Sequence, residues 1–450
     1  MRQRRPLAGA DRPDGVRAGR RGALAAARGA ARRCQRRQGD TAVTGKAKRV
    51  GPLAGVRVID LTNVIMGPFA THILADLGAD VIKVEAPEGD TFRSYRPARH
   101  TAMAGNFLHL NRNKRSIVLD LKTPAARAAL DQLIAGADVF VHAMRPAAAE
   151  RLGYGHAHVS QLRPDIVYCG AYGFGAEGRY AEKAAYDDII QAGSGLSALQ
   201  NAMHGAPGYL PTVLCDKIAG QAIAYSIIAA LFQRASGGGG QAIEVPMFET
   251  MVEFNLIEHM MGSAFEPPLG PPGFNRVISH HRKPYATRDG YACILPYSDR
   301  NWQDFFDFTR RAEFKGDPRF ANLGERVQNI DVLYAVVEEE AARRTTAEWI
   351  AFCDRVSIPC MPVNDLVDLF EDLHLRDVGF FSVAEHPSEG AYRVMRRPVS
   401  FSSAPFEIRH HAPGLGAQTR EILEEAGLPE ETIRALTGQP SCDTPMEQIS

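Results

Sequence analysis

The feature that most constrains the fold is an alternation of short apolar strands with helices, beginning at residue 56. Residues 56–61 are typical of a strand, residues 67–77 of a helix with proline in its first turn, and Asp80–Glu85 of the next strand. Two strands joined through a helix within about thirty residues form a β-α-β unit, and such units build parallel sheets. The alternation continues in four further segments, namely strands at residues 117–120, 138–142 and 165–169 and a helix at residues 124–135. The pattern predicts a doubly wound, mostly parallel, Rossmann-like α/β domain.

A long apolar helix is predicted over residues 216–235, followed by a four-glycine turn at residues 237–240 that leads into a strand. Asp216 stands at the start of this helix, and spacing alone leaves two interpretations open. Its carboxylate either caps the helix and does nothing more, or it stays ionised at the positive end of the helix dipole and acts as a nucleophile. We find no run of about eighteen apolar residues, and therefore expect no membrane-spanning segment.

The net charge of zero hides an asymmetry between the first fifty residues and the rest. Residues 1–50 hold 13 Arg and 2 Lys against 3 Asp, a balance of +12 that leaves −12 for the remainder. This segment has almost no large apolar side chain, so we predict a disordered basic tail that cannot build a core. An organelle-targeting peptide or a nucleic-acid-binding arm would also be basic, but the segment lacks a clear amphipathic face and interleaved aromatics. We favour a leader without a role in the fold, and expect no nucleic-acid partner.

The cysteines indicate a reducing compartment. Their number is odd, and no two have the C-x-x-C spacing of zinc, iron–sulfur or redox motifs; they stand at positions 34, 169, 215, 293, 353, 360 and 442. We therefore expect a cytoplasmic protein without disulfides or a bound metal. Cys215, next to Asp216, is either a thiol nucleophile or, more commonly for such a residue, a small buried hydrophobe.

Two further motifs suggest phosphate binding. Residues 173–178 match G-x-G-x-x-G after a strand, but the apolar helix and the later acidic residue of a dinucleotide site are missing, so we expect a glycine loop shaped around another ligand. Arg112, Lys114 and Arg115 form a basic cluster, which is either a solvated face or a phosphate-binding group.

The second half of the chain predicts a smaller domain. Residues 265–280 are rich in proline and glycine, residues 283–295 read as a hairpin, and residues 301–311 and 332–344 as helices, which together suggest an α+β unit. A C-terminal helix is predicted near residues 418–426. We divide the chain into a tail at residues 1–50, the first part of the large domain at 51–262, a small domain with linkers at 263–350, and a C-terminal segment at 351–450.

Several segments together resemble the class III CoA-transferases, the group of formyl-CoA and carnitine CoA-transferases and α-methylacyl-CoA racemase. The matching segments run in family order from about residue 52 to 430 and include NRNKRSIVLDLK, AYDDIIQAGSGL, LCDKIAG, GGGGQAIEVPMFE and SIPCMPV. The resemblance implies a large and a small domain, with the C-terminal segment returning to the large one. It also implies a homodimer in which two chains are interlocked.

The resemblance also implies the chemistry. Asp216, in Cys-Asp-Lys-Ile-Ala-Gly, falls on the family's catalytic aspartate, although Cys215 replaces the usual glycine. The implied reaction moves CoA from an acyl-CoA thioester to a free carboxylic acid through a covalent aspartyl intermediate. CoA is then a substrate, and no permanently bound cofactor is implied. Racemases of this group need a histidine where this chain has Tyr186, a poor proton acceptor at neutral pH, which favours the transferase. The alternatives are an acyl-CoA epimerase and a CoA-binding protein without catalysis.

For CoA contacts, the resemblance points to Ile65, Met66, Leu119, Lys122, Met144, Arg145, Arg151 and the loop at residues 185–187, which includes Tyr186 and Asp187. Arginine and lysine suit the phosphates of CoA. Ala86 and Ala143 replace residues that are often Arg and Asn in the family, so Arg112, Lys114 or Lys83 is expected to supply the missing charge. The residues around the acid are less defined, and the candidates are Tyr209, Phe274, His280, His281 and Arg282.

Overall fold

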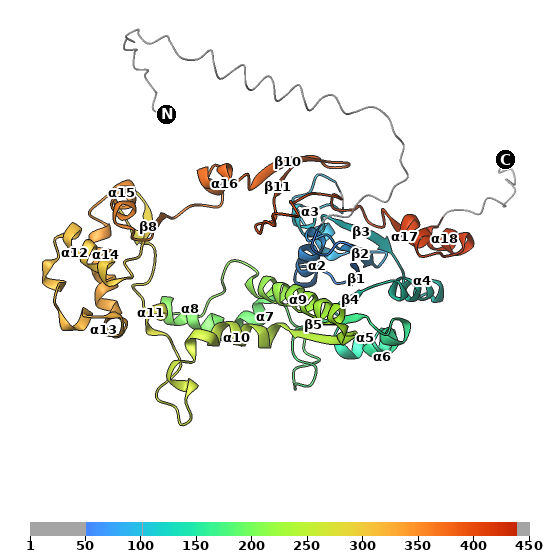
Figure 1. Ribbon diagram of the computed structural model, residues 1–450, viewed down its shortest axis with the longest axis horizontal. Coiled ribbons are helices and arrows are strands. Elements are labelled where there is room, and N and C mark those ends of the chain that lie inside the picture. The colour runs from blue at the N-terminus through green and yellow to red at the C-terminus, as the bar shows by residue number, and fades with distance from the viewer. Residues whose placement is uncertain (1–50, 101, 439–450) are drawn as a thin grey trace, which may run out of the picture. The chain divides into compact units, whose positions relative to one another are not determined.

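The structure is a computed structural model that describes residues 51–100 and 102–438 (Figure 1). The basic segment at residues 1–50, for which a disordered tail is predicted, lies outside the described residues. So does Cys442, one of the seven cysteines.

The centre of the large domain is a six-stranded sheet in the order β3-β2-β1-β4-β5-β6, in which every neighbouring pair is parallel. The strands are β1 (Arg57–Leu61), β2 (Asp80–Glu85), β3 (Lys114–Val118), β4 (Val139–His142), β5 (Val167–Tyr172) and β6 (Gln241–Pro246). This order confirms the predicted doubly wound α/β fold. The chain builds outward from β1 in one direction to β3, then returns to β4 on the other side of β1, so the order reverses between β1 and β4.

Helices cover both faces of this sheet. Successive residues along a strand point to opposite faces, so apolar residues on both faces must be buried. Val58 and Val81 belong to one apolar core, whereas their neighbours Ile59 and Ile82 belong to another. The helices of this part of the chain are α2 (Met66–Asp76), α3 (Gly105–Leu110), α4 (Pro124–Ala135), α5 (Pro146–Leu152), α6 (His156–Leu162), α7 (Asp187–Gly193), α8 (Leu196–His204), α9 (Leu214–Gln233) and α10 (Met247–His259), with a short 3-10 turn η1 (Thr91–Ser94). Residues of α2 and α9 lie in the first core, and residues of α4 and α6 in the second.

The long helix α9 begins two residues before its predicted start and packs against α2. A Cβ atom on Gly220 would stand 2.7 Å from the carbonyl oxygen of Met66, so glycine permits the close approach of the two helices. Together with the turn that follows it, Leu214–Gly238 is long and apolar enough to cross a membrane by length and composition, contrary to our expectation that no such stretch exists. Half of its most apolar 18-residue window is buried inside the fold, as in the core helix of an α/β domain.

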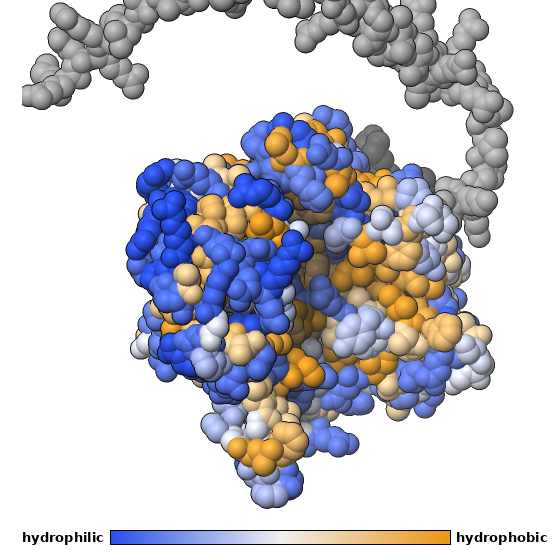
Figure 2. All heavy atoms as spheres, turned by 60° about the vertical axis from the view of Figure 1, so that its left-hand side comes forward, coloured by the Kyte–Doolittle hydropathy of each residue, from blue (hydrophilic) through white to orange (hydrophobic). Residues whose placement is uncertain are grey.

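Several large apolar side chains nevertheless remain on the surface of α9 and α10. Tyr225 and Phe232 on α9 are 64% and 74% exposed, and Ile257 on α10 is 78% exposed. Figure 2 shows that hydrophobic side chains lie open in patches on the face that it draws. Patches of this kind commonly mark surfaces that another molecule covers.

The smaller unit is a three-stranded antiparallel sheet packed against helices. Its strands are β7 (Tyr285–Ala286), β8 (Tyr291–Ile294) and β9 (Cys360–Pro362), so the predicted hairpin is present. Its helices are α11 (Asn275–Ile278), α12 (Asp299–Thr309), α13 (Leu323–Gln328), α14 (Ile330–Ala341) and α15 (Thr346–Val356). Trp302, Phe305 and Trp349 lie at the centre of a separate aromatic core. The helix α15 runs across the predicted domain boundary at residue 350.

The C-terminal segment contains α16 (Leu373–Asp377), an antiparallel hairpin of β10 (Phe381–His386) and β11 (Gly390–Met395), α17 (Thr419–Glu425) and α18 (Glu430–Thr437). It packs beside the edge strand β3. The backbone N–H of Gln418 donates to the Ser116 carbonyl at 3.0 Å, and the Gln418 side chain accepts from the Ser116 N–H at 2.9 Å. Ile422 and Leu423 of α17 join the second core of the large domain.

Candidate active site

The sheet order identifies where a ligand can bind. In an open parallel sheet, ligands occupy the crevice outside the carboxyl ends of the strands, at the point where the strand order reverses. Here that point lies between β1 and β4, and the loops that follow these strands lead into α2 and α5. Ile65 ends the first loop and Met66 begins α2, and Met144 and Arg145 come from the second loop. Four of the CoA contacts that resemblance implies therefore flank one crevice.

The remaining implied contacts differ in how open they are. Leu119, after β3, is 1% exposed, whereas Lys122 is exposed. Arg151, in the last turn of α5, is also exposed. Arg145 is exposed, and its guanidinium donates to the Glu182 carbonyl at 2.8 Å. Three of the implied cationic contacts are thus exposed: Lys122 and Arg145, in the loops after β3 and β4, and Arg151, at the end of α5.

Asp216 lies in the first turn of α9 but does not cap it. The N-cap is Val213, and no side chain bonds to the helix start from that position. The interpretation of Asp216 as the helix cap is therefore wrong. Its backbone N–H instead donates to the carboxylate of Asp187 at 3.2 Å. Asp187, the first residue of α7, is 5% exposed, and its other oxygen accepts from the Gln191 amide at 2.6 Å.

The Asp216 carboxylate itself has no hydrogen bond or ion pair within residues 51–100 and 102–438. Its residue is half-buried. Burial, and next the negative charge of Asp187, raise the pKa of Asp216 to about 7. In the other interpretation the helix dipole keeps this carboxylate ionised; desolvation outweighs that effect, so near neutral pH the group is divided between acid and anion.

Cys215 has no thiolate character. It is fully buried, and burial, followed by the charges of Asp187 and Asp216, raises the pKa of its thiol to about 12. Of the two interpretations for this residue, the structure supports the small buried hydrophobe. Asp216 is then the reactive candidate of the pair.

Both interpretations of the basic cluster are wrong, because its side chains are buried and paired. The Arg112 guanidinium contacts Asp76 at 2.6 Å and that of Arg115 contacts Asp80 at 2.8 Å. Lys114, with no exposed surface, lies 3.4 Å from Asp60 and donates to Thr71 at 2.8 Å. Lys114 and Arg115 form part of β3, which begins three residues earlier than predicted. The cluster joins β3 to β1, α2 and β2.

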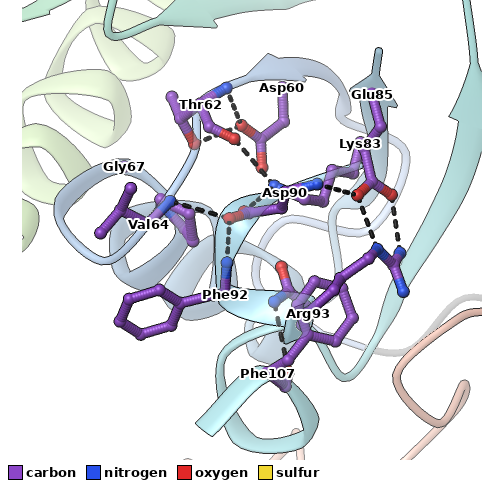
Figure 3. A network of polar contacts seen from close by, with 12 residues as sticks. Asp60, Thr62, Val64, Gly67, Lys83, Glu85, Asp90, Phe92, Arg93 and Phe107 are labelled. Atoms are coloured by element: carbon purple, nitrogen blue, oxygen red, sulfur yellow. Dashed lines mark hydrogen bonds and ion pairs between the residues drawn. The ribbon is translucent and has the colours of Figure 1, made fainter. Parts of the chain in front are cut away.

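Lys83 also requires a correction. Its ammonium has no exposed surface, lies 2.9 Å from the Asp90 carboxylate and donates to the Thr62 carbonyl at 2.8 Å (Figure 3). A buried ammonium that already has these partners is not open to the phosphates of CoA.

The backbone N–H groups of the glycine motif at residues 173–178 also bind side chains of the same chain. The backbone N–H of Gly175 donates to Glu249 at 3.1 Å, and that of Ala176 donates to Glu244 at 2.6 Å. Two carboxylates at these amides would repel a phosphate in the same place. This agrees with the sequence-based prediction that the motif is not a dinucleotide site. The four-glycine turn enters β6 as predicted, with positive φ at Gly237 and Gly239.

The histidines proposed for the acid-binding region have partners as well. His280 contacts the Met203 carbonyl at 2.9 Å, and His281 contacts the Glu338 carboxylate at 3.0 Å. Within the part of the chain that the structure describes, no group of three or more His, Cys, Asp or Glu side chains is arranged to hold a metal ion.

Sequence reasoning missed His142, the last residue of β4. It is fully buried; its Nδ1 accepts from the Met144 N–H at 3.2 Å, and its Nε2 lies 2.7 Å from the Tyr168 hydroxyl. Burial lowers the pKa of His142 to about 4, so the ring is neutral and can accept the Met144 bond. The only sequence signal is a histidine that ends an apolar strand. That signal does not distinguish a histidine that binds the backbone of the next loop from one that is simply packed in the core.

An open parallel sheet with ligand-binding loops at its switch point, and a half-buried carboxylate at a helix start, is typical of α/β enzymes. Comparison with known proteins specifies the class. A model described as CoA-transferase family III matches residues 53–419. Succinyl-CoA:glutarate CoA-transferase of Mus musculus is 32% identical over 378 residues, which cover 83% of this chain and 86% of that protein.

Two further relatives agree. Formyl-CoA:oxalate CoA-transferase of Afipia carboxidovorans is 29% identical over 398 residues, covering 83% of this chain and 93% of its own. The crystal structure of a CAIB/BAIF family protein from Brucella suis has a TM-score of 0.70 and 29% sequence identity, covering 84% of this chain and all of that one. The chain belongs to CoA-transferase family III. It is a transferase that uses CoA thioesters as substrates.

Proposed function

We propose that this protein transfers CoA from an acyl-CoA to a free carboxylic acid through a covalent intermediate on Asp216. The observation that carries the proposal is the unpaired, half-buried carboxylate of Asp216 in the first turn of α9. A nucleophile must be free of competing ion pairs, and a pKa near neutrality leaves a working fraction of anion. The relatives named for succinyl-CoA with glutarate, and for formyl-CoA with oxalate, suggest short carboxylic acids as donor and acceptor.

The first half of the reaction loads CoA onto the enzyme. A carboxylate oxygen of Asp216 attacks the thioester carbon, the carbon–sulfur bond breaks, and an acyl-aspartyl anhydride and CoA thiolate form. The thiolate then attacks the aspartyl carbonyl of the anhydride. The donor acid leaves as its carboxylate, and Asp216 carries CoA as a thioester.

The second half reverses these steps with the acceptor acid. Its carboxylate attacks the aspartyl thioester, giving a new anhydride and CoA thiolate; the thiolate attacks the acceptor's acyl carbon, and the new acyl-CoA leaves while Asp216 returns as a carboxylate. No proton is consumed. Each step develops an oxyanion next to the start of α9, where the positive end of the helix dipole favours negative charge.

We also propose that two chains associate, as the resemblance implies. The exposed apolar side chains of Tyr225, Phe232 and Ile257 support this proposal, because their burial against a second copy would remove a large hydrophobic area from water. Light scattering after gel filtration should give twice the chain mass, and a monomer at micromolar concentration would refute the dimer.

The test of the covalent intermediate is intact-protein mass after mixing with a panel of acyl-CoAs that starts with succinyl-CoA and formyl-CoA. We expect an acyl- or CoA-sized adduct on the wild type and none on Asp216→Ala. Asp188→Ala is the matched control, because Asp188 is an exposed carboxylate on the neighbouring helix α7. An adduct that persists on Asp216→Ala refutes the assignment.

A second readout separates the transferase from an acyl-CoA epimerase. If the wild type forms no adduct, and instead washes deuterium from solvent into the α-carbon of an acyl-CoA, the reaction is isomerisation. Free CoA that binds equally to the wild type and Asp216→Ala, without turnover of any acid, would indicate a binding protein.

A further inference from the structure

The loop between β1 and α2 has a backbone conformation that is costly for its sequence. Val64 has φ +71°, in the left-handed region, which a β-branched residue adopts only under constraint. Gly67, at the start of α2, faces Thr62 so closely that a Cβ atom would stand 2.2 Å from the Thr62 side chain. The loop is therefore folded tightly on itself as it enters the helix. Conformations of this kind persist where the surroundings fix them, and they are common at functional sites.

One buried ion pair holds this loop at two points. The Asp90 carboxylate, on a residue 1% exposed, lies 2.9 Å from the ammonium of Lys83, which has no exposed surface. Asp90 accepts the backbone N–H of Val64 at 3.2 Å, while Lys83 donates to the carbonyl of Thr62 at 2.8 Å. The two charged groups thus bind backbone groups two residues apart in the strained segment (Figure 3).

Further hydrogen bonds hold Asp90, the acidic member of this ion pair, in place. The backbone N–H of Phe92 donates to Asp90 at 3.0 Å, and the backbone N–H of Asp90 donates to Glu85 at 3.1 Å. Glu85 in turn makes two 2.7 Å bonds to the Arg93 guanidinium. Asp90 therefore cannot shift without breaking several buried contacts, and charge-assisted bonds to backbone amides are among the stronger hydrogen bonds in proteins.

Stability alone does not account for a charged pair at this place, since apolar residues of similar size often stabilise a fold at least as well as a buried ion pair. The contacts go to the loop that carries Ile65 and Met66 at the switch point of the sheet. We propose that Asp90 is a positioning residue for CoA binding: with Lys83, it holds the Thr62–Val64 backbone so that the loop is already in its binding conformation before CoA arrives. The proposal rests on the CoA site described above, and places no chemistry on Asp90.

The consequence is that loss of the Val64 contact weakens CoA binding, because the free loop relaxes and must be reordered when the ligand binds. The effect should appear in the Kd of CoA and the KM of acyl-CoA, while kcat at saturation changes little, since the loop contacts the bound molecule in the ground state and the transition state alike.

The test compares two double variants, Lys83→Met/Asp90→Asn and Lys83→Met/Asp90→Ala. Methionine removes the lysine charge in both, so neither contains an unpaired buried ammonium. Asparagine retains an oxygen that accepts the Val64 N–H, and alanine does not. Titration with free CoA should give a Kd about tenfold weaker for the alanine variant than for the asparagine variant. Equal dissociation constants for the two would overturn the proposal.

Two controls keep the result specific. Leu333→Ala creates a cavity in the core of the small unit, and should lower stability without changing the Kd of CoA. If Leu333→Ala weakens CoA binding as much as the alanine double variant, general destabilisation explains both and the proposal fails. The measurement uses free CoA and needs no covalent step, so the absence of an Asp216 adduct would refute the proposed mechanism while leaving this comparison interpretable.

Hydrogen exchange provides a test on the wild type that does not depend on how the variants fold. The Val64 amide should exchange slowly in the enzyme without CoA, at a rate close to that of the buried Phe92 amide. Fast exchange of the Val64 amide that becomes slow only when CoA is added would show that the ligand, and not Asp90, orders the loop.

Discussion

Asp187 accepts a hydrogen bond from the backbone N–H of Asp216 at 3.2 Å, so one carboxylate anchors the helix turn that carries the other. Resemblance assigns Asp187 to CoA, but the structure buries it and gives both of its oxygens partners within the chain, Asp216 and Gln191. Its negative charge then acts on Asp216 and raises the pKa of that carboxyl, after the larger effect of burial. The position of Asp216 and the pKa of its carboxyl are thus linked through one residue.

The first prediction follows from this link. With a pKa of about 7, Asp216 loses its anion as the pH falls, so the rate of adduct formation at saturating acyl-CoA should decline about tenfold per pH unit below neutrality and level off above it. Asp187→Asn removes the neighbouring charge and retains an oxygen for the Asp216 N–H, so the pKa should fall and the profile should move to lower pH. Stopped-flow or quenched mass measurement across about pH 5 to 9 gives both profiles. A profile that moves to higher pH would contradict the electrostatic account.

The second prediction concerns stability in mild acid. The pKa of buried His142 is about 4 in the folded protein and about 6.5 when unfolded. The unfolded chain therefore takes up a proton first, and stability should fall as the pH drops from about 6.5 to 4, by about 3 kcal/mol at most from this residue. Urea unfolding at several pH values measures the slope. His142→Asn should reduce that slope by close to one proton while leaving an acceptor for the Met144 N–H; an unchanged slope would contradict the assignment.

Much of the fold could be predicted from sequence because its signals are local. The β-α-β pattern and the glycine turn before β6 each lie within a few consecutive residues, and the hydrophobic period determines which strand faces are buried. The basic cluster could not be predicted in this way. Lys114 and Arg115 are charged residues in a strand, and only their partners Asp60 and Asp80, on β1 and β2, make their burial possible.

Prediction of the site is limited in the same way, because it too depends on contacts between residues far apart in the sequence. Asp216 could be selected by motif, whereas its link to Asp187 spans 29 positions and depends on how α7 and α9 meet. Sequence reasoning offers Lys83 as a replacement for a charge that the family has and this chain lacks, whereas its burial beside Asp90 is visible only in the tertiary fold. Residue type and spacing indicate which chemistry is available, and burial decides which groups are free to use it.

The third prediction tests the close packing of α9 on α2. Because a Cβ on Gly220 would stand 2.7 Å from the Met66 carbonyl oxygen, a backbone atom at the start of α2, Gly220→Ala should force the helices apart and destabilise the protein by about 1–3 kcal/mol. Gly105→Ala is the control, since Gly105 lies in α3 with no atom near its added Cβ. Chemical denaturation compares the two. Equal or greater stability of Gly220→Ala would show that the helices are not in close contact.

The fourth prediction tests the strain at Val64. At most sites, a protein with glycine is less stable than the same protein with alanine, because glycine gives the unfolded chain more conformational freedom. At φ +71° that order should reverse, since glycine adopts the left-handed region without cost: Val64→Gly should be about 1 kcal/mol more stable than Val64→Ala. Both variants remove the two γ methyl groups of valine from the half-buried site and differ only by the Cβ methyl, so most of the lost packing cancels in the comparison. Thermal or urea unfolding of the two variants decides the sign. If alanine is the more stable of the pair, the left-handed conformation is absent in solution, and the loop that Asp90 and Lys83 hold is not under strain.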